Sequence, residues 1–258
     1  MLVDDVVFGA STGQPPQLRE YHARLLVDDS NAGDAARLDL AEFIGCQNWV
    51  MLQISEIAVL DAWKNSKKKA GQLDTMELVT RASLIKQILL DKLQSLDASS
   101  SPPRHKGLSC FDMYKGQSLR NDSRTLVTRI WAHAALLYLS LVVPGWQPSI
   151  SANRLGVTQI LTLLEQMPAC DLLRTMVWPF CIAGYLAHQD EEARFRALAD
   201  ALVPHQLFGD PRKALEIMEN VWKSRHELNA DTDLASCISR PRVHALGQMR
   251  LGYIPLLN

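Results

Sequence analysis

Residues 172–187, LLRTMVWPFCIAGYLA, decide the fold, because this stretch is apolar on every side and carries a single charge, at Arg174. A helix that is hydrophobic all round lies buried in a globular protein. Pro179 sits in its middle, where a missing backbone donor and a steric clash predict a kink. Gly184 leaves room for a neighbouring helix or a ligand to approach closely. With Trp178 at the bend, the stretch favours a cavity beside a kinked central helix.

Composition limits the function classes. Of 258 residues, 47% are hydrophobic and 21% are charged, as in a globular protein with a substantial core. The net charge of −1 disfavours direct nucleic-acid binding, which needs clustered lysines and arginines to contact phosphates. The longest apolar run, residues 134–144, is too short to cross a bilayer, so no membrane segment is expected.

The cysteines and the motifs predict neither a metal nor a cofactor. The nearest pair, Cys170 and Cys181, is eleven positions apart, which excludes a cysteine zinc cluster by spacing. Five cysteines without a signal peptide indicate reduced thiols inside a cell, in the nucleus or the cytosol. Neither phosphate-binding nor dinucleotide-binding nor metalloprotease motifs occur, so no cofactor is expected.

Helical spacing of apolar residues, with no strand alternation and no repeat, predicts an all-α fold. We expect a single irregular helical domain at residues 35–258, preceded by an N-terminal segment at residues 1–34. A loop rich in serine, proline and glycine is expected at about residues 98–120. Further helices are predicted at residues 124–143, 151–167, 189–202 and 211–228.

Glycine and aspartate residues predict where the first long helices begin and end. Gly45 indicates a break in the helix that starts near residue 35, and Gly71 its end, after three lysines in the last turn. Asp74 is the expected cap of a helix at residues 75–96. The face of that helix predicted to be buried consists of Met76, Val79, Leu84, Ile88 and Leu93.

Two kinds of polar residue inside apolar runs invite a functional interpretation. His133 could act as a general acid or base or donate to a carbonyl, although a core histidine bonded to a backbone carbonyl is the more frequent case. Tyr138 follows five positions later. Glu56 and Asp61 are predicted to form buried ion pairs with an arginine, at position 129 or 174, because an unpaired buried carboxylate is costly.

Five tryptophans sit on predicted helices, where they are usually core residues, but tryptophans beside a proline kink can also wall an apolar pocket. If a ligand binds, the expected lining residues are Trp49, Gln53, Glu56, Trp131, His133, Trp178, Cys181 and Tyr185. If the protein is an enzyme, His133 and Tyr138 are the candidate catalytic residues.

Four blocks of sequence resemble one family: GCQNWVML and ISEIAVLDAWK within residues 45–64, TRIWAHAALLYL at 128–139, VWPFCIAG at 177–184 and ALEIMENVW at 214–222. The family is the fungal-specific transcription factor domain, the helical regulatory domain of zinc binuclear cluster regulators. The resemblance spans about residues 38–238 and implies an all-helical domain that senses effectors or restrains activation and does not touch DNA. The family's zinc cluster is absent from the sequence, and its leading helices are expected to be short or missing before residue 35.

Two main hypotheses follow. The first is a regulatory helical domain without its own DNA-binding head, tied to fungal secondary metabolism and responding to a small apolar molecule or to a regulatory protein partner. The second is a cofactor-free enzyme, an isomerase or cyclase and possibly a cycloaddition catalyst, that folds an apolar substrate in the same cavity. A truncated gene product without a function is the third. The residues leave the effector, the substrate and the oligomeric state open.

Overall fold

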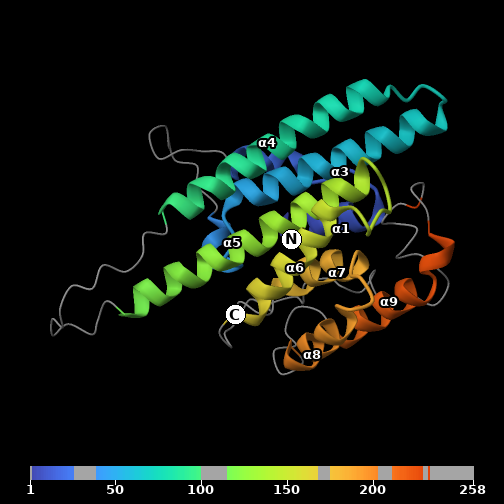
Figure 1. Cartoon of the computed structure of the whole chain (residues 1–258). Helices are drawn as coiled ribbons and strands as arrows, with labels where there is room; N and C mark the ends of the chain where they lie inside the picture. The colour runs from blue at the N-terminus through green and yellow to red at the C-terminus, as the bar shows by residue number, and fades with distance from the viewer. Residues whose placement is uncertain are drawn as a thin grey trace, which may run out of the picture.

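The computed structural model describes residues 2–25, 39–99, 115–167, 175–202, 211–228 and 232. These residues form helices and no strand, so the all-α prediction is confirmed (Figure 1). The α-helices are α1 (Leu2–Thr12), α2 (Leu40–Phe43), α3 (Asn48–Lys69), α4 (Thr75–Ser99), α5 (Lys115–Val142), α6 (Ser151–Glu165), α7 (Val177–Tyr185), α8 (Glu192–Leu202) and α9 (Pro211–Lys223).

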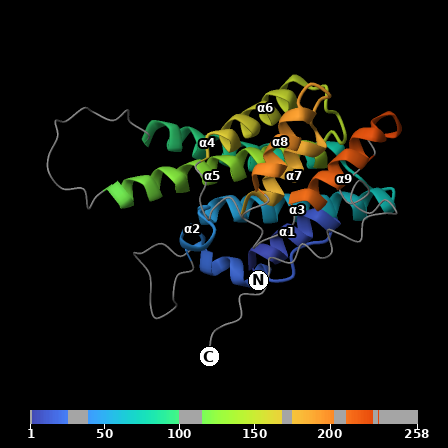
Figure 2. The same ribbon diagram turned by 90° about the horizontal axis from the view of Figure 1, so that it is seen from below.

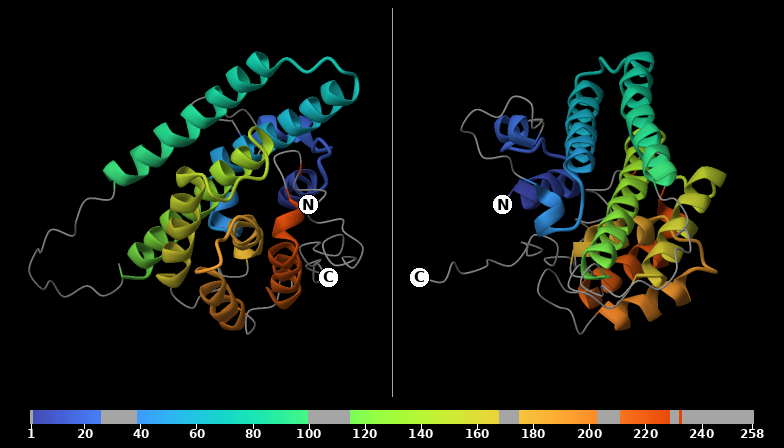
Figure 3. Two further views of the ribbon diagram at one scale, coloured as in Figure 1. Left: turned by 45° about the vertical axis from the view of Figure 1, so that its right-hand side comes forward. Right: turned by 90° about the vertical axis from the view of Figure 1, so that its left-hand side faces the viewer.

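The helices stack in layers around α7. Helices α3 and α4 form an antiparallel pair on one side, and α1 packs against α3 (Figures 1 and 2). Helix α5 packs against α3, α4, α6 and α7, and it thereby joins the outer pair to the centre. Helices α8 and α9 pack against each other on the opposite side, with α9 against α7 (Figure 3). The core therefore lies between the packed helices α3, α5, α7 and α9.

Helix α7 is buried as predicted, but Pro179 lies nearer its start than predicted. All nine of its residues are buried. The helix begins at Val177, so Pro179 lies in its first turn rather than in its middle. The first four N–H groups of a helix have no partner within the helix, so proline is tolerated there without bending it. The first residues of the predicted stretch, 172–174, lie outside the described part of the chain.

At Gly184, α9 packs directly against α7. A Cβ atom added there would lie 1.8 Å from Sδ of Met218, which shows that a neighbouring helix occupies the space beside this glycine. The indole N–H of Trp222, also on α9, donates to the Gly184 carbonyl over 2.8 Å. The predicted close approach is therefore confirmed, and the partner is a helix.

The boundaries of α3 and α4 follow the predicted signals. Gly45 has a φ of 74° between α2 and α3, and Gly71, with a φ of 66°, follows α3. Both values lie in the left-handed region that glycine adopts without strain. Asp74 Oδ1 accepts hydrogen bonds from the backbone N–H groups of Met76 (2.8 Å) and Glu77 (3.3 Å), and so caps α4.

The predicted buried face of α4 is largely wrong. Met76 is 74% exposed and Leu84 65%, and Val79 and Ile88 are exposed as well. Only Leu93 of the predicted set is buried, as part of a face that also includes Leu78, Ala82 and Leu89. Because α4 is an outer helix that contacts α3 and α5 along one side, a narrow apolar stripe is enough to pack it against the fold. The spacing of apolar residues did not identify which of its two apolar stripes is the buried one.

Helix α5 begins at Lys115, so the predicted loop at residues 98–120 is too long at both ends: α4 continues to Ser99, and residues 100–114 lie outside the described chain. The segment Ser123–Val142 of α5 is long and apolar enough to cross a membrane by length and composition. However, 67% of this segment's apolar window is buried inside the fold, as in the core helix of a globular protein.

Candidate functional site

An aromatic cluster joins α5 to α7 in the core. The rings of Trp131 and Trp178 stack with their centroids 5.3 Å apart and an angle of 14° between planes. Tyr138 approaches Trp178 edge-on, at 6.0 Å and 84°. Trp131 is 2% exposed, Trp178 7% and Tyr138 0%, so offset-stacked and edge-to-face contacts form away from water. The structure thus brings together three of the aromatic residues that the sequence singled out.

Two hydrogen-bond donors of this cluster find no acceptor in the described part of the chain. The indole Nε1 atoms of Trp131 and Trp178 are buried and have no hydrogen-bond partner among the described residues. Gln53 Oε1, on α3, is a buried acceptor in the same situation. A buried polar group left without a partner costs about 1–3 kcal/mol, and buried indole N–H groups usually find one. The two donors and the acceptor are therefore left unsatisfied by the described residues.

Burial favours the neutral forms of His133 and Cys181. Burial lowers the pKa of His133 to about 4; the Asp97 carboxylate raises it and the Arg129 guanidinium lowers it further. Arg129 and Asp97 form an ion pair of their own. Burial also raises the pKa of Cys181 to about 12, partly opposed by a hydrogen bond with Tyr185. Near pH 7 His133 is uncharged and Cys181 is a thiol rather than a nucleophilic thiolate.

Other predicted site residues are engaged elsewhere. The Trp49 indole N–H donates to Gln47 Oε1 over 2.7 Å. Glu56 pairs with Arg19 at 2.9 Å, and its side chain is 45% exposed. The predicted pairing of Glu56 with Arg129 is therefore wrong, since the chain turns this carboxylate toward the segment after α1.

Asp61 behaves differently from Glu56. Its side chain is 3% exposed, and it pairs with Lys64 at 3.1 Å, one turn along α3. The carboxylate is thus buried and paired as predicted, but with a neighbour on its own helix rather than with an arginine. Arg174 lies outside the described residues.

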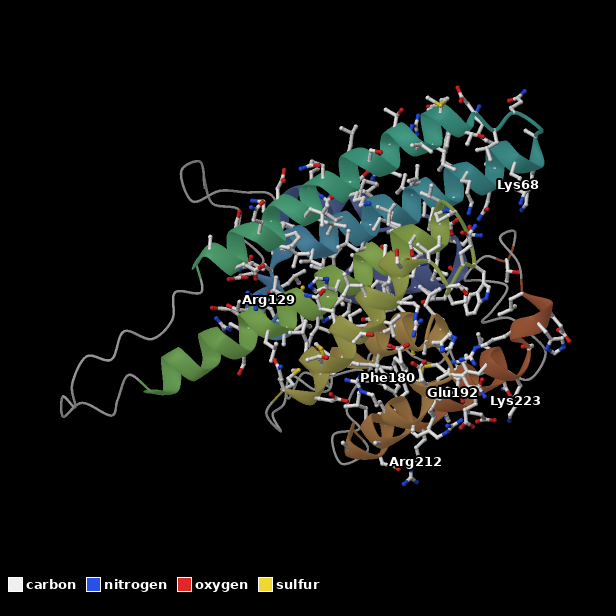
Figure 4. The ribbon with its side chains drawn as sticks, viewed as in Figure 1. Lys68, Arg129, Phe180, Glu192, Arg212 and Lys223 are labelled. Atoms are coloured by element: carbon white, nitrogen blue, oxygen red, sulfur yellow. The ribbon has the colours of Figure 1, made fainter. Side chains whose placement is uncertain are left out.

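Sequence reasoning missed a surface pocket between the start of α8 and the end of α9. It has a volume of about 320 Å³. The pocket lies apart from the Trp131–Trp178 cluster, near the labelled side chains of Glu192 and Lys223 (Figure 4). The abundance of arginine and glutamate in residues 189–202 was the available signal, but it does not specify which helix completes the pocket. The lining residues are Gln189, Glu192, Arg196, Glu219, Trp222, Lys223 and Arg225.

Comparison with known proteins decides the family. The model of the fungal specific transcription factor domain matches residues 5–245. The chain belongs to this family. The match begins at residue 5, within α1, so of the expected short or missing leading helices the second alternative is corrected: the family's leading region is present before residue 35. It also includes most of α1, whose Val6 and Ala10 are buried in the common core.

Curated relatives are transcription factors and regulators. Transcription factor dibT of Pestalotiopsis microspora is 36% identical over 93% of this chain and 38% of its own length. The trichothecene biosynthesis transcription regulator TRI10 of Fusarium sporotrichioides is 29% identical over 73% and 40% of the two chains. The ustiloxin B cluster transcription factor ustR of Aspergillus flavus is 27% identical over 87% and 36%.

The fungal transcription factor domain described here spans about two-fifths of the length of these relatives. No solved structure matches it. The cyclase hypothesis gains no support from these comparisons, because the relatives are transcription regulators.

Proposed function

We propose that this chain is the helical regulatory domain of a transcriptional regulator of a fungal secondary-metabolite gene cluster, acting in the nucleus. The observation that carries the proposal is the family match over residues 5–245. It is supported by relatives whose names tie them to trichothecene biosynthesis and to the ustiloxin B cluster. In this proposal the domain receives a signal, and binding to the promoter is the task of another part of the regulator or of a partner.

We further propose that the signal is a small, largely apolar molecule with hydrogen-bond acceptors, such as carbonyl oxygens. The support is the pair of buried indole N–H groups of Trp131 and Trp178, which lack an acceptor among the described residues. A ligand that supplies acceptors would relieve two desolvated donors, and polar groups of this kind fix a ligand's orientation in an apolar site. Gln53 Oε1 would accept a hydrogen bond from the same ligand.

A regulatory protein partner is a second candidate for the signal. Its support is the outer surface of α4, where the apolar side chains of Met76 and Leu84 are 74% and 65% exposed. Exposed apolar side chains grouped on one helix are typical of protein–protein contact. This candidate predicts that substitutions on α4, and not in the aromatic cluster, abolish regulation.

A reporter experiment tests both. The chain would be fused to a heterologous DNA-binding domain and an activation domain in a fungal host, and reporter output measured with and without extract of a metabolite-producing culture. We expect the extract to change reporter output, and Trp131→Phe, which keeps a stacked ring but removes the N–H, to abolish the response. Trp63→Phe is the matched control, because Trp63 lies under Arg81 at the surface of the fold.

The outcomes separate the proposals. Loss of the response in Met76→Ser/Leu84→Ser, with Trp131→Phe unaffected, would favour the protein partner and overturn the apolar effector. A fusion whose reporter output never changes, in any variant or with any extract, would contradict the regulatory function itself. Circular dichroism melting of each purified variant would show that it is folded.

A further inference from the structure

We propose that the pocket at the junction of α8 and α9 binds a small monocarboxylate, at a site separate from the aromatic cluster. The pocket of about 320 Å³ is at the small end of the range for ligand sites. The inference rests on its lining and on its charge balance, and it holds whether or not the regulatory function proposed above is correct.

The two acidic residues of the pocket are already neutralised. Glu192 accepts hydrogen bonds from Arg196 (3.1 Å) and Arg225 (2.8 Å). Glu219 accepts from Nε of Arg196 at 2.8 Å. Arg225 also donates to the backbone carbonyl of Ala187 at 2.7 Å, which ties the end of α9 to the end of α7. These contacts fix both arginines, so neither side chain has to be reoriented when a ligand binds.

Trp222 holds this arrangement in place. Its indole N–H is bonded to the Gly184 carbonyl, and its ring is 6% exposed. The guanidinium carbons of Arg196 and Arg225 lie 5.3 and 5.9 Å from the ring centroid, within the range of cation–π contact. Trp222 and the two arginines are therefore held in place before a ligand binds, which lowers the entropic cost of binding.

One positive charge of the lining remains uncompensated. The lining carries three cations (Arg196, Lys223 and Arg225) against two carboxylates (Glu192 and Glu219), an excess of one. Lys223 is exposed, and it forms no ion pair with the described residues. A monoanion matches this excess of one, whereas a dianion such as sulfate would leave one negative charge uncompensated in the pocket. The Gln189 amide, also in the lining, can donate a hydrogen bond to the second carboxylate oxygen.

The proposal is tested by NMR titration of the purified chain with benzoate. The reporter is the indole ¹H–¹⁵N signal of Trp222, assigned by its loss in Trp222→Phe. We expect this signal to shift saturably with benzoate at constant ionic strength, and to shift less with sulfate. Benzyl alcohol, which has the same ring but no charge, should leave it unchanged.

Substitution of Lys223 provides the residue-level test. Lys223→Gln should weaken benzoate binding roughly fivefold, as expected for one exposed charge-assisted contact. Lys223→Arg should retain binding, and Lys213→Gln is the control on the same helix, outside the pocket lining. Equal affinity in Lys223→Gln and in the wild type, or a shift of the same size with benzyl alcohol, would overturn the proposal. The measurement needs no promoter, so its failure would leave the regulatory function untouched.

Discussion

At the scale of the residue, Gly184 shows how one missing side chain sets the distance between two core helices. Gly184→Ala would place a methyl group 1.8 Å from Sδ of Met218, which is itself fully buried and cannot swing into solvent. We expect this overpacking to lower the free energy of unfolding by about 1–3 kcal/mol, measured by urea denaturation. In a double-mutant cycle, adding Met218→Ala should cost less than it does in the wild type. Strictly additive effects would contradict the contact.

His133 predicts a specific pH dependence of stability. Its pKa is about 4 in the folded chain, against an ordinary value of 6.5. As pH falls from 6.5 towards 4, the unfolded state takes up a proton that the folded state does not, so stability is present above pH 6.5 and lost below it. The loss should reach roughly 2–3 kcal/mol.

The same histidine provides the control for that measurement. His133→Gln should reduce the fall in unfolding free energy between pH 6.5 and pH 4, whereas His226→Gln, at an exposed position, should not. NMR titration of the His133 ring should give a midpoint near 4. A midpoint near 6.5 would show that the surroundings of the ring do not lower its pKa as described.

For individual residues, burial could be predicted from the sequence, but hydrogen-bond and ion-pair partners could not. The burial of Trp131 and Trp178 could be predicted because both lie in long apolar runs. Their unpartnered N–H groups could not, because hydrogen bonding depends on which atoms from α3, α5 and α7 face one another. Glu56 shows the same limit, since its partner Arg19 comes from a segment 37 positions away.

At the scale of the element, α4 shows that the spacing of apolar residues predicts a helix but not which of its faces is buried. Its length and its Asp74 cap followed from local sequence, but it has two apolar stripes, and only packing decides which one faces α3 and α5. We expect Leu89→Ala, at a fully buried position, to lower the free energy of unfolding by about 2–5 kcal/mol. Leu84→Ala, at a position that is 65% exposed, should change it by less than about 0.5 kcal/mol.

Chemical denaturation of these two variants, side by side, checks the orientation of α4. If the larger loss came from Leu84→Ala, α4 would be rotated about its axis relative to the described structure. Helix α7 shows the same limit. Its burial could be predicted from its composition. Its start at Val177, which places Pro179 in the first turn, could not be predicted from the spacing of apolar residues.

At the scale of the whole molecule, the order of the layers depends on α7. This short helix contacts α5 and α6 on one side and α9 on the other, so a change in its position would shift the helices on both sides of it. The aromatic cluster lies on its α5 side, while the α8–α9 pocket lies beyond its C-terminal end. The family resemblance could be read from the sequence, but this arrangement of two candidate sites around one helix could not.

If this chain belongs to a regulator of a biosynthetic gene cluster, as we propose, its loss should alter the transcript levels of that cluster. Messenger RNA from the genes neighbouring its own would be quantified in a deletion strain, in the parent, and in a strain complemented with the wild-type gene. We expect a concerted change in those transcripts on deletion, reversed by complementation. Unchanged transcripts together with accumulation of an unprocessed precursor would contradict it.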